Sequence, residues 1–231
     1  MSDEQNTGLD FADVLASSIH DMKNSLGMVL SALEEVVDTE SGRCNCTPEQ
    51  VAQLQYEAKR VNDNLIQLLT LYKMERGQYG LNVDEVDVAE FLEESYLKNK
   101  PLLEYKGIGL DTEVDEDVVG YFDRYLLDGV VDNVVTNATR YTRDRLKITA
   151  EEENGWLHLR VQDNGEGFPP TMLGRGTGVE REGSFGAGRT KLGLHFCALV
   201  AGAHHNNGRS GYIELSNDSE LGGGSFSIYL P

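Results

Sequence analysis

The chain has 231 residues, longer than one typical domain and shorter than two large ones, so one or two compact domains are expected. Its 20 lysines and arginines against 39 aspartates and glutamates give a net charge of −19, which argues against nucleic acid as a partner. No apolar stretch approaches the roughly 18 residues of a membrane span, and the acidic N-terminus does not resemble a secretion signal. We therefore expect a cytoplasmic protein whose three cysteines are reduced.

The first 80 residues predict two long helices. Apolar residues recur at spacings of three and four from Phe11 to Val37, which is typical of an amphipathic helix. A polar stretch follows, and Thr47 then provides the N-cap of a second periodic segment that ends near Gly77. The two helices form an antiparallel hairpin that cannot bury its own apolar stripe, so we expect dimerisation into a four-helix bundle.

After residue 80 the pattern changes to short strands and helices that interleave without strict alternation. This mixture predicts a two-layer α/β sandwich with a mixed sheet. The glycine-rich stretch 165–193 has few apolar residues and predicts a long mobile loop, a type of loop that is usually functional. The predicted strands are 108–114, 146–150, 157–161, 212–215 and 226–230, and the predicted helices are 88–98, 125–140 and 192–203.

The first predicted helix contains a histidine that could act as a nucleophile. His20 and Asn24 are four residues apart and therefore share a helix face. A carboxylate such as Asp21 can hold an imidazole in the tautomer that exposes one ring nitrogen as a nucleophile, and can accept its proton. An ordinary surface histidine explains the same residues, so the motif alone decides nothing.

A second group of polar residues lies in the later part of the chain. Asn133 and Asn137 share one face of a predicted helix, and Arg140 follows within one turn. Amide oxygens suit Mg²⁺, and a guanidinium group suits phosphate oxygens. Asp163 ends a predicted strand and is followed by glycines that allow close approach of the backbone. Helix capping and a simple turn are the structural alternatives.

Taken in order, these segments resemble the core of a sensor histidine kinase of two-component signalling, and the resemblance covers nearly the whole chain. It implies a dimerisation and histidine-phosphotransfer domain at residues 1–80 and an ATP-binding catalytic domain of GHKL (Bergerat-like) fold at 81–231. HDMKNSL resembles the phospho-acceptor box, DNVVTNATRYT the asparagine box, DNGEGFP the first glycine box, and GAGRTKLGLHFCALVAG and GGGSFSIYLP the later glycine boxes.

The resemblance implies an ATP- and Mg²⁺-dependent kinase that autophosphorylates His20 and passes the phosphoryl group to an aspartate of a response-regulator receiver domain. In that family Asp21 stands for the general base, and Asn24 for the residue that orients water when the partner is dephosphorylated. Asn137 would coordinate Mg²⁺, Asn133 and Arg140 would contact the phosphates, and Asp163 would bind the adenine amino group. The full set of nucleotide-binding candidates is Asn133, Asn137, Arg140, Tyr141, Asp163, Gly165, Gly167, Lys191 and Gly193.

The chain departs from the family pattern at several positions. Ser25 stands where the family usually has proline, and Arg189 and Lys191 replace two glycines of the second glycine box. Each replacement costs about 1 kcal/mol where a positive φ is required, but the two cations would also attract a triphosphate. Asn133 stands where related ATPases have a water-activating glutamate, which favours transfer to His20 over hydrolysis.

Two other functions remain open from the sequence. A phosphotransfer or adaptor protein with a catalytic domain that no longer binds nucleotide is favoured by the altered glycine box. A chaperone-like ATPase is disfavoured by the helical hairpin with its histidine. Little chain precedes Phe11, so we expect either that the sequence is part of a longer protein or that the signal comes from a separate sensory protein, with a homodimer as the signalling form.

Overall fold

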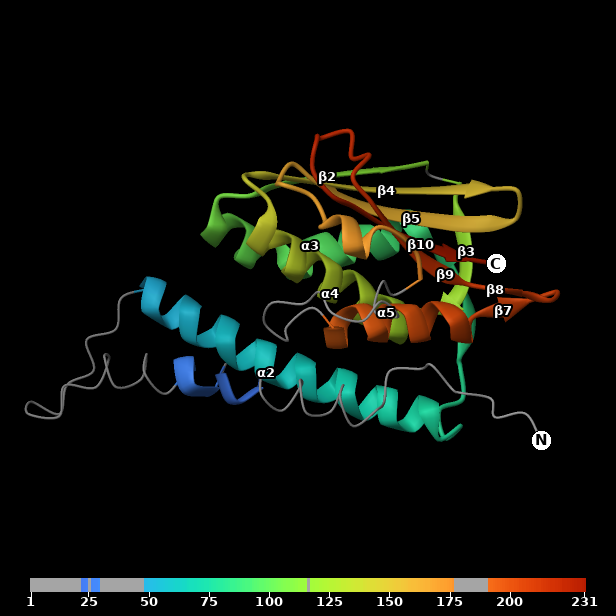
Figure 1. Cartoon of the computed structure of the whole chain (residues 1–231), viewed down its shortest axis with the longest axis horizontal. Helices are drawn as coiled ribbons and strands as arrows, with labels where there is room; N and C mark the ends of the chain where they lie inside the picture. The colour runs from blue at the N-terminus through green and yellow to red at the C-terminus, as the bar shows by residue number, and fades with distance from the viewer. Residues whose placement is uncertain (1–21, 25, 30–47, 116, 177–190) are drawn as a thin grey trace, which may run out of the picture. The chain divides into compact units, whose positions relative to one another are not determined.

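The computed structural model describes residues 22–24, 26–29, 48–115, 117–176 and 191–231. It divides into two compact units (Figure 1), and each is described here by itself. One unit contains helix α2, and the other begins at Tyr79 and includes most of the remaining described chain. Residues 22–24 and 26–29 are helical, as expected for the first predicted helix. His20, Asp21 and the rest of that predicted helix lie outside the described residues.

Helix α2 spans Pro48–Glu75 and confirms the second predicted helix. Its C-terminus is closed by Gly77, which has a φ of 63° and donates its N–H to the Met74 carbonyl at 2.9 Å. Leu65, Leu69 and Tyr72 follow one another at helical spacing, and their side chains are 46%, 52% and 41% exposed. An apolar stripe along α2 is therefore open to solvent.

The second unit is built on a six-stranded sheet with the strand order β2-β4-β5-β10-β9-β6. Only β2 and β4 run parallel, and every other neighbouring pair is antiparallel, so the sheet is mixed as predicted. The strands are β2 Gly109–Val114, β4 Arg145–Glu153, β5 Trp156–Asp163, β6 Gly174–Arg175, β9 Tyr212–Ser216 and β10 Ser225–Leu230.

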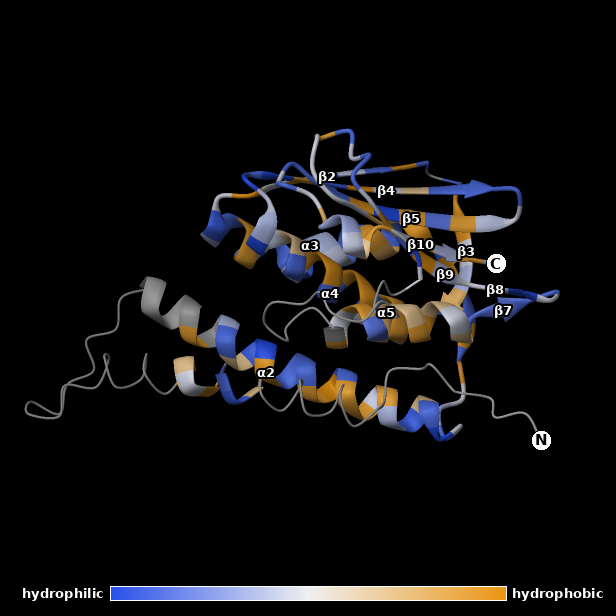
Figure 2. Cartoon of the chain, in the orientation of Figure 1, coloured by the Kyte–Doolittle hydropathy of each residue, from blue (hydrophilic) through white to orange (hydrophobic). Residues whose placement is uncertain are grey.

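Three helices cover one face of this sheet: α3 Val88–Lys106, α4 Arg124–Tyr141 and α5 Lys191–Ala203 (Figure 1). Alternate residues of the strands are buried beneath them, as Leu146, Ile148 and Ala150 of β4 are. Figure 2 shows apolar residues along α4 and α5 and hydrophilic ones at the turn between β4 and β5. The two-layer α/β sandwich is thus confirmed, with its core between the helices and the sheet.

Several elements differ from the sequence prediction. Helix α3 continues past Pro101 to Lys106, where Gly107 caps it with a φ of 65°, rather than ending at residue 98. The antiparallel pair β1 Val83–Asp87 and β3 Val119–Asp123 was not predicted, because Val86 is the only buried residue of the acidic strand β1. A small hairpin of β7 His205–Asn206 and β8 Arg209–Ser210 was also not predicted.

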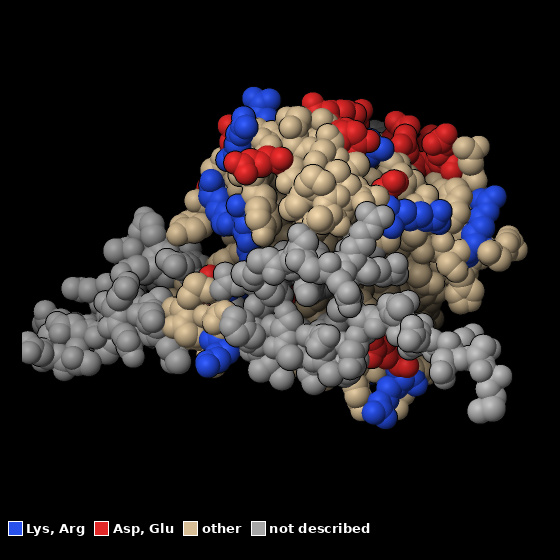
Figure 3. All heavy atoms as spheres, in the orientation of Figure 1, with Lys and Arg blue, Asp and Glu red and all other residues tan. Residues whose placement is uncertain are grey.

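The surface of the described residues has two general features. Figure 3 shows acidic and basic side chains in separate small groups on the visible face, without one continuous basic area among the residues drawn in colour. Within the described ranges, no helix combines the length and the hydropathy that crossing a membrane requires.

Candidate functional site

The carboxylate of Asp163 is held rigidly where β5 ends. The backbone of Asp163 pairs with the glycine-rich turn before β10, donating to the Gly224 carbonyl at 3.0 Å and accepting from Gly223 N–H at 3.1 Å. Its side-chain Oδ1 accepts from Gly165 N–H at 2.6 Å and from Gly224 N–H at 3.2 Å. The residue is 8% exposed, and Oδ2 makes no hydrogen bond with any residue that the structure describes. One carboxylate oxygen is therefore fixed, and the other is left as an acceptor.

Glycines surround Asp163 because no side chain fits there. A Cβ atom on Gly165 would lie 2.1 Å from the Tyr141 carbonyl oxygen, since this turn passes directly against the end of α4. A Cβ on Gly223 would lie 2.4 Å from Asp163 Oδ1, and one on Gly224 2.9 Å from Oδ2. Gly167 has a φ of 81°, and its Cβ would meet Asn217. The wall around the carboxylate is consequently made largely of backbone, with the Phe168 ring against Gly224.

On α4, Asn133 and Asn137 form a connected pair. Asn137 Nδ2 donates to Asn133 Oδ1 at 3.2 Å, and Asn133 Nδ2 donates to the sulfur of Cys197 on α5 at 3.3 Å. Within the described chain, Asn137 Oδ1 has no hydrogen-bond donor. Asn133 therefore orients the Asn137 amide, and Asn137 presents an oxygen for a ligand.

Helix α5 packs closely against this pair. A Cβ on Gly193 would lie 2.5 Å from Asn133 Oδ1, so only glycine permits the observed approach. Cys197 is fully buried, and burial raises the pKa of its thiol to about 12. The thiol is therefore protonated at neutral pH and serves as a weak acceptor for Asn133 rather than as a nucleophile.

The remaining candidate residues differ in their exposure and in how much of them the structure describes. Arg140 is partly exposed on α4, and no ion pair occupies it within the described ranges. The Tyr141 side chain is 61% exposed at the end of the same helix. Lys191 is the first residue of α5, but its side chain lies outside the described residues. Asn24 belongs to the helical unit, which is described separately.

The structure thus forms two groups of direct contacts around the C-terminal half of α4. One group contains Asn133, Asn137 and Gly193, and the other contains Tyr141, Asp163 and Gly165. The structure does not connect His20, Asp21 or Lys191 to them, because those side chains are not described.

Two asparagines that support the site were missed by the sequence analysis. Asn164 Oδ1 accepts from three successive backbone N–H groups, those of Arg143, Asp144 and Arg145, at 3.1 to 3.2 Å. Asn217 forms a two-bond pair with the backbone of Phe168, with distances of 2.7 and 2.9 Å. The first asparagine lies within the DNG motif, whereas the second has no local signal in the sequence.

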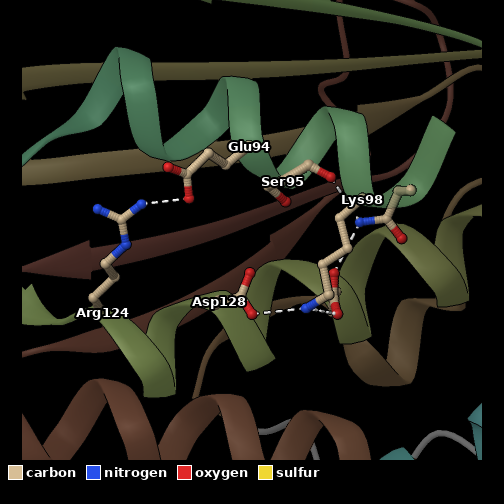
Figure 4. A network of polar contacts seen from close by, with 7 residues as sticks. Glu94, Ser95, Lys98, Arg124 and Asp128 are labelled. Carbon is tan, nitrogen blue, oxygen red and sulfur yellow. Dashed lines mark hydrogen bonds and ion pairs between the residues drawn. The ribbon is translucent and has the colours of Figure 1, made fainter.

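Helix α4 is also fixed from the side by α3. Figure 4 shows Glu94 and Lys98 of α3 facing Arg124 and Asp128 of α4. Glu94 pairs with Arg124 at 2.5 Å, and Lys98 pairs with Asp128 at 2.7 Å and also with Asp132. Although burial opposes it, hydrogen bonds to Asp128 and Asp132 raise the pKa of Lys98 and keep it charged. The helix that presents Asn133 and Asn137 is therefore held along its length.

The chain is similar to known proteins in sequence and in fold. Residues 122–231 match the family described as histidine kinase-, DNA gyrase B- and HSP90-like ATPase. The sensor protein SrrB of Staphylococcus aureus is 26% identical over 238 aligned residues, which include 100% of this chain and 40% of SrrB. The histidine kinase AdeS of Acinetobacter baumannii superposes with a TM-score of 0.64 at 19% identity, covering 91% of this chain and 96% of that structure. The catalytic domain of histidine kinase ThkA superposes with a TM-score of 0.53 at 24% identity, covering 65% of this chain and 95% of that structure.

Residues 122–231 therefore match the histidine kinase-, DNA gyrase B- and HSP90-like ATPase family, and the chain as a whole is homologous to sensor histidine kinases. The fold of its second unit is that of histidine kinase catalytic domains. The chain spans 40% of the length of its SrrB relatives.

Proposed function

We propose that the chain is an ATP-dependent protein histidine kinase that autophosphorylates His20 and transfers the phosphoryl group to an aspartate of a response-regulator receiver domain. The observation that supports this best is the Asp163 carboxylate, whose Oδ1 is fixed by two backbone N–H groups while Oδ2 stays available. Such an acceptor, walled by glycine backbone, suits the exocyclic amino group of adenine.

The donor set near Asn137 fits Mg²⁺. Its Oδ1 is a hard oxygen without a competing donor among the described residues, and Mg²⁺ characteristically takes one or two protein oxygens together with phosphate oxygens and water. A bound Mg²⁺ would neutralise charge on the triphosphate during transfer. Asn133 would hold the Asn137 amide in place, and Arg140 would contact phosphate oxygens.

The proposed chemistry is an in-line phosphoryl transfer. A ring nitrogen of His20 attacks the γ-phosphorus, the bond to the bridging oxygen breaks, and ADP leaves with that electron pair. Asp21 accepts the proton from the imidazole. In the second step a carboxylate oxygen of the receiver aspartate attacks the phosphorus on His20, and the histidine nitrogen leaves. Asn24 would orient the water that later dephosphorylates the partner, giving a phosphatase activity.

The proposed assembly is a homodimer through the helical hairpin. The exposed stripe of Leu65, Leu69 and Tyr72 on α2 supports it, because a second copy would cover these side chains in a four-helix bundle. We further propose a separate sensory protein as the source of the signal, and the cytoplasm, where ATP is available, as the place of reaction.

The direct test is incubation of the full chain with radiolabelled ATP and Mg²⁺. The wild type should acquire label that is labile in acid and stable in base, and His20→Gln should acquire none. A His205→Gln variant is the matched control, because it removes an exposed imidazole and leaves the proposed acceptor. Nucleotide binding without label on a folded dimer would contradict kinase activity. Absence of nucleotide binding would favour an adaptor, with Arg189 and Lys191 as the first residues to revert to glycine.

A further inference from the structure

One buried aspartate, through its carboxylate and its backbone N–H, joins three segments of the second unit. Asp123 ends β3, is 3% exposed and caps the N-terminus of α4, with Oδ1 accepting from Leu126 N–H at 3.1 Å. Its other oxygen, Oδ2, accepts from Asn82 N–H at 3.0 Å. A helix cap needs only one of these oxygens. The second oxygen is bound by the segment that follows α2, residues 79–82.

That arriving segment is tied to Asp123 more than once. The chain leaves the C-terminal cap of α2 at Gly77 and enters the second unit at Tyr79. The pKa of the Tyr79 phenol is raised by burial and then by the charge of Asp123, with smaller contributions from Tyr125 and from hydrogen bonding to the Asp123 carboxylate. Residues 79–82 are therefore attached to the cap of α4 by the backbone hydrogen bond of Asn82 and by the interaction of the Tyr79 phenol with the same carboxylate.

The third segment is the end of α5. The backbone N–H of Asp123 donates to His204 Nε2 at 2.9 Å, and the other ring nitrogen, Nδ1, lies 2.8 Å from the Val200 carbonyl. This geometry requires the neutral tautomer with a proton on Nδ1, in agreement with the lowering of the His204 pKa by burial. Asp123 thus contacts both the start of α4 and the end of α5.

These are the two helices that meet at the proposed nucleotide site. Asn133 lies ten residues beyond Asp123 on α4, about 15 Å along a helix axis at 1.5 Å per residue. Asn133 touches Gly193 and Cys197 of α5. A helix is a stiff element, so a displacement of the capped end of α4 would reach the Asn133–Asn137 pair.

We propose that Asp123 is a positioning residue that couples the chain leaving α2 to the Asn133–Asn137 pair, so that nucleotide binding and attachment of residues 79–82 influence each other. The inference rests on the proposed function, since it takes the Asn133–Asn137 pair as part of a nucleotide site. Reciprocity is required thermodynamically: if attachment of the segment changes nucleotide affinity, nucleotide must stabilise that attachment by the same factor.

A plain helix cap would give different results from a coupling residue. Asparagine caps a helix about as well as aspartate, so Asp123→Asn keeps a capping oxygen for Leu126. The substitution turns an NH₂ group, which is a donor, towards Asn82 N–H and Tyr79. Tyr79→Phe removes one bond of the segment and leaves the cap intact. Tyr121→Phe is the matched control, because it deletes a tyrosine–carboxylate hydrogen bond to Glu85 at 2.9 Å in the adjacent β1–β3 pair without touching Asp123.

The experiment is amide hydrogen exchange of the full chain, with and without a non-hydrolysable ATP analogue and Mg²⁺. In the wild type and Tyr121→Phe, nucleotide should slow exchange of residues 79–83 by about fivefold or more, the lower range of measured coupling. In Asp123→Asn and Tyr79→Phe this slowing should fall below about twofold, while protection at residues 163–167 persists. Undiminished protection of 79–83 in both variants would overturn the inference.

The same experiment separates failure of the inference from failure of the proposed function. If nucleotide protects no segment of the wild type, the nucleotide site is refuted. The attachment is then judged without nucleotide, from the Asn82 amide that donates to Asp123. That amide should exchange about fivefold faster in Tyr79→Phe than in Tyr121→Phe, and equal rates would overturn the attachment itself.

Discussion

The two sides of the candidate site are stabilised by different means. Around Asp163 the carboxylate is held by backbone N–H groups of Gly165 and Gly224, and the wall is glycine backbone. Around Asn137 the geometry depends on side chains, because Asn133 orients the amide and is itself held by Cys197. The difference implies that the first side fails when bulk is added, whereas the second fails gradually when side chains are shortened.

The largest effect, on the free energy of unfolding, is expected from adding one methyl group to the glycine backbone around Asp163. In Gly165→Ala the new Cβ would lie 2.1 Å from the Tyr141 carbonyl oxygen, which is backbone and cannot rotate away. Either the turn or the end of α4 must move, and we expect a loss of about 3 kcal/mol or more in the free energy of unfolding. Urea denaturation measures this loss. Gly222→Ala is a matched control with a different cause of strain, because its φ is 89° but nothing lies within 4 Å of its Cβ. Equal losses in the two variants would show that steric contact at Gly165 is unimportant.

A smaller effect, on affinity rather than stability, is expected from Asp163→Asn. The amide oxygen can replace Oδ1 as acceptor for Gly165 and Gly224, but the NH₂ group then stands where Oδ2 was. An adenine amino group would face a donor instead of an acceptor, with an expected loss of about 2 kcal/mol, or roughly 30-fold in affinity. Calorimetry with ATP and with GTP measures it. A uniform loss for both nucleotides would mean that Asp163 does not recognise the base.

The side-chain half of the comparison is tested by Asn133→Ala. The Asn137 amide would lose its oriented partner, and the Cys197 thiol would lose its donor, without any steric clash. We expect nucleotide affinity to fall by about fivefold, near 1 kcal/mol, with a stronger dependence on Mg²⁺ concentration than in the wild type. Titration of Mg²⁺ at fixed ATP reveals the difference. A loss that is independent of Mg²⁺ would place the role of Asn133 at the phosphates alone.

The sequence could predict the elements with strong periodicity but not the contacts that cross the fold. Helices α2, α4 and α5 and the central strands have regular apolar spacing, and they were located within a few residues. The strand β1 has the sequence VDEVD with one buried residue, so its pairing with β3 leaves almost no local trace. Sequence rules favour a helix end near a proline, yet Pro101 lies inside α3. Tertiary packing of α3 outweighs the backbone hydrogen bond that proline cannot donate.

The same distinction applies to the site. Asn137, Asp163 and the glycines were predicted because they lie in short motifs, whereas Asn217 reaches Phe168 across 49 residues of sequence. The attachment of Asn82 to Asp123 spans 41 residues and likewise has no motif. Hydrogen bonds between residues so far apart in the sequence can be identified only once the pairing of the strands is known.

The smallest expected effect is a dependence of the unfolding free energy on pH through His204, which holds the end of α5. His204 fastens the end of α5 to Asp123 as a neutral imidazole, and burial lowers its pKa, with a further lowering by His205 that the Val200 carbonyl and the Asp123 carboxylate oppose. The unfolded chain keeps an ordinary histidine pKa near 6.5, so below that pH the unfolded state binds more protons than the folded one. The contribution of His204 to stability is therefore complete above about pH 6.5 and decreases as the pH falls through the folded pKa.

The measurement that isolates this contribution is the difference in unfolding free energy between the wild type and His204→Gln from pH 8 to pH 5. His158 also has a lowered pKa, through burial and the charge of Arg160, but it is present in both proteins, and its effect cancels in the difference. We expect the advantage of the wild type to shrink steadily below about pH 6.5, with hydrogen exchange at the end of α5 accelerating before exchange at residues 163–167. A difference that is flat with pH would show that the imidazole tolerates protonation, and that the tie between α5 and the cap of α4 is not made through its Nε2.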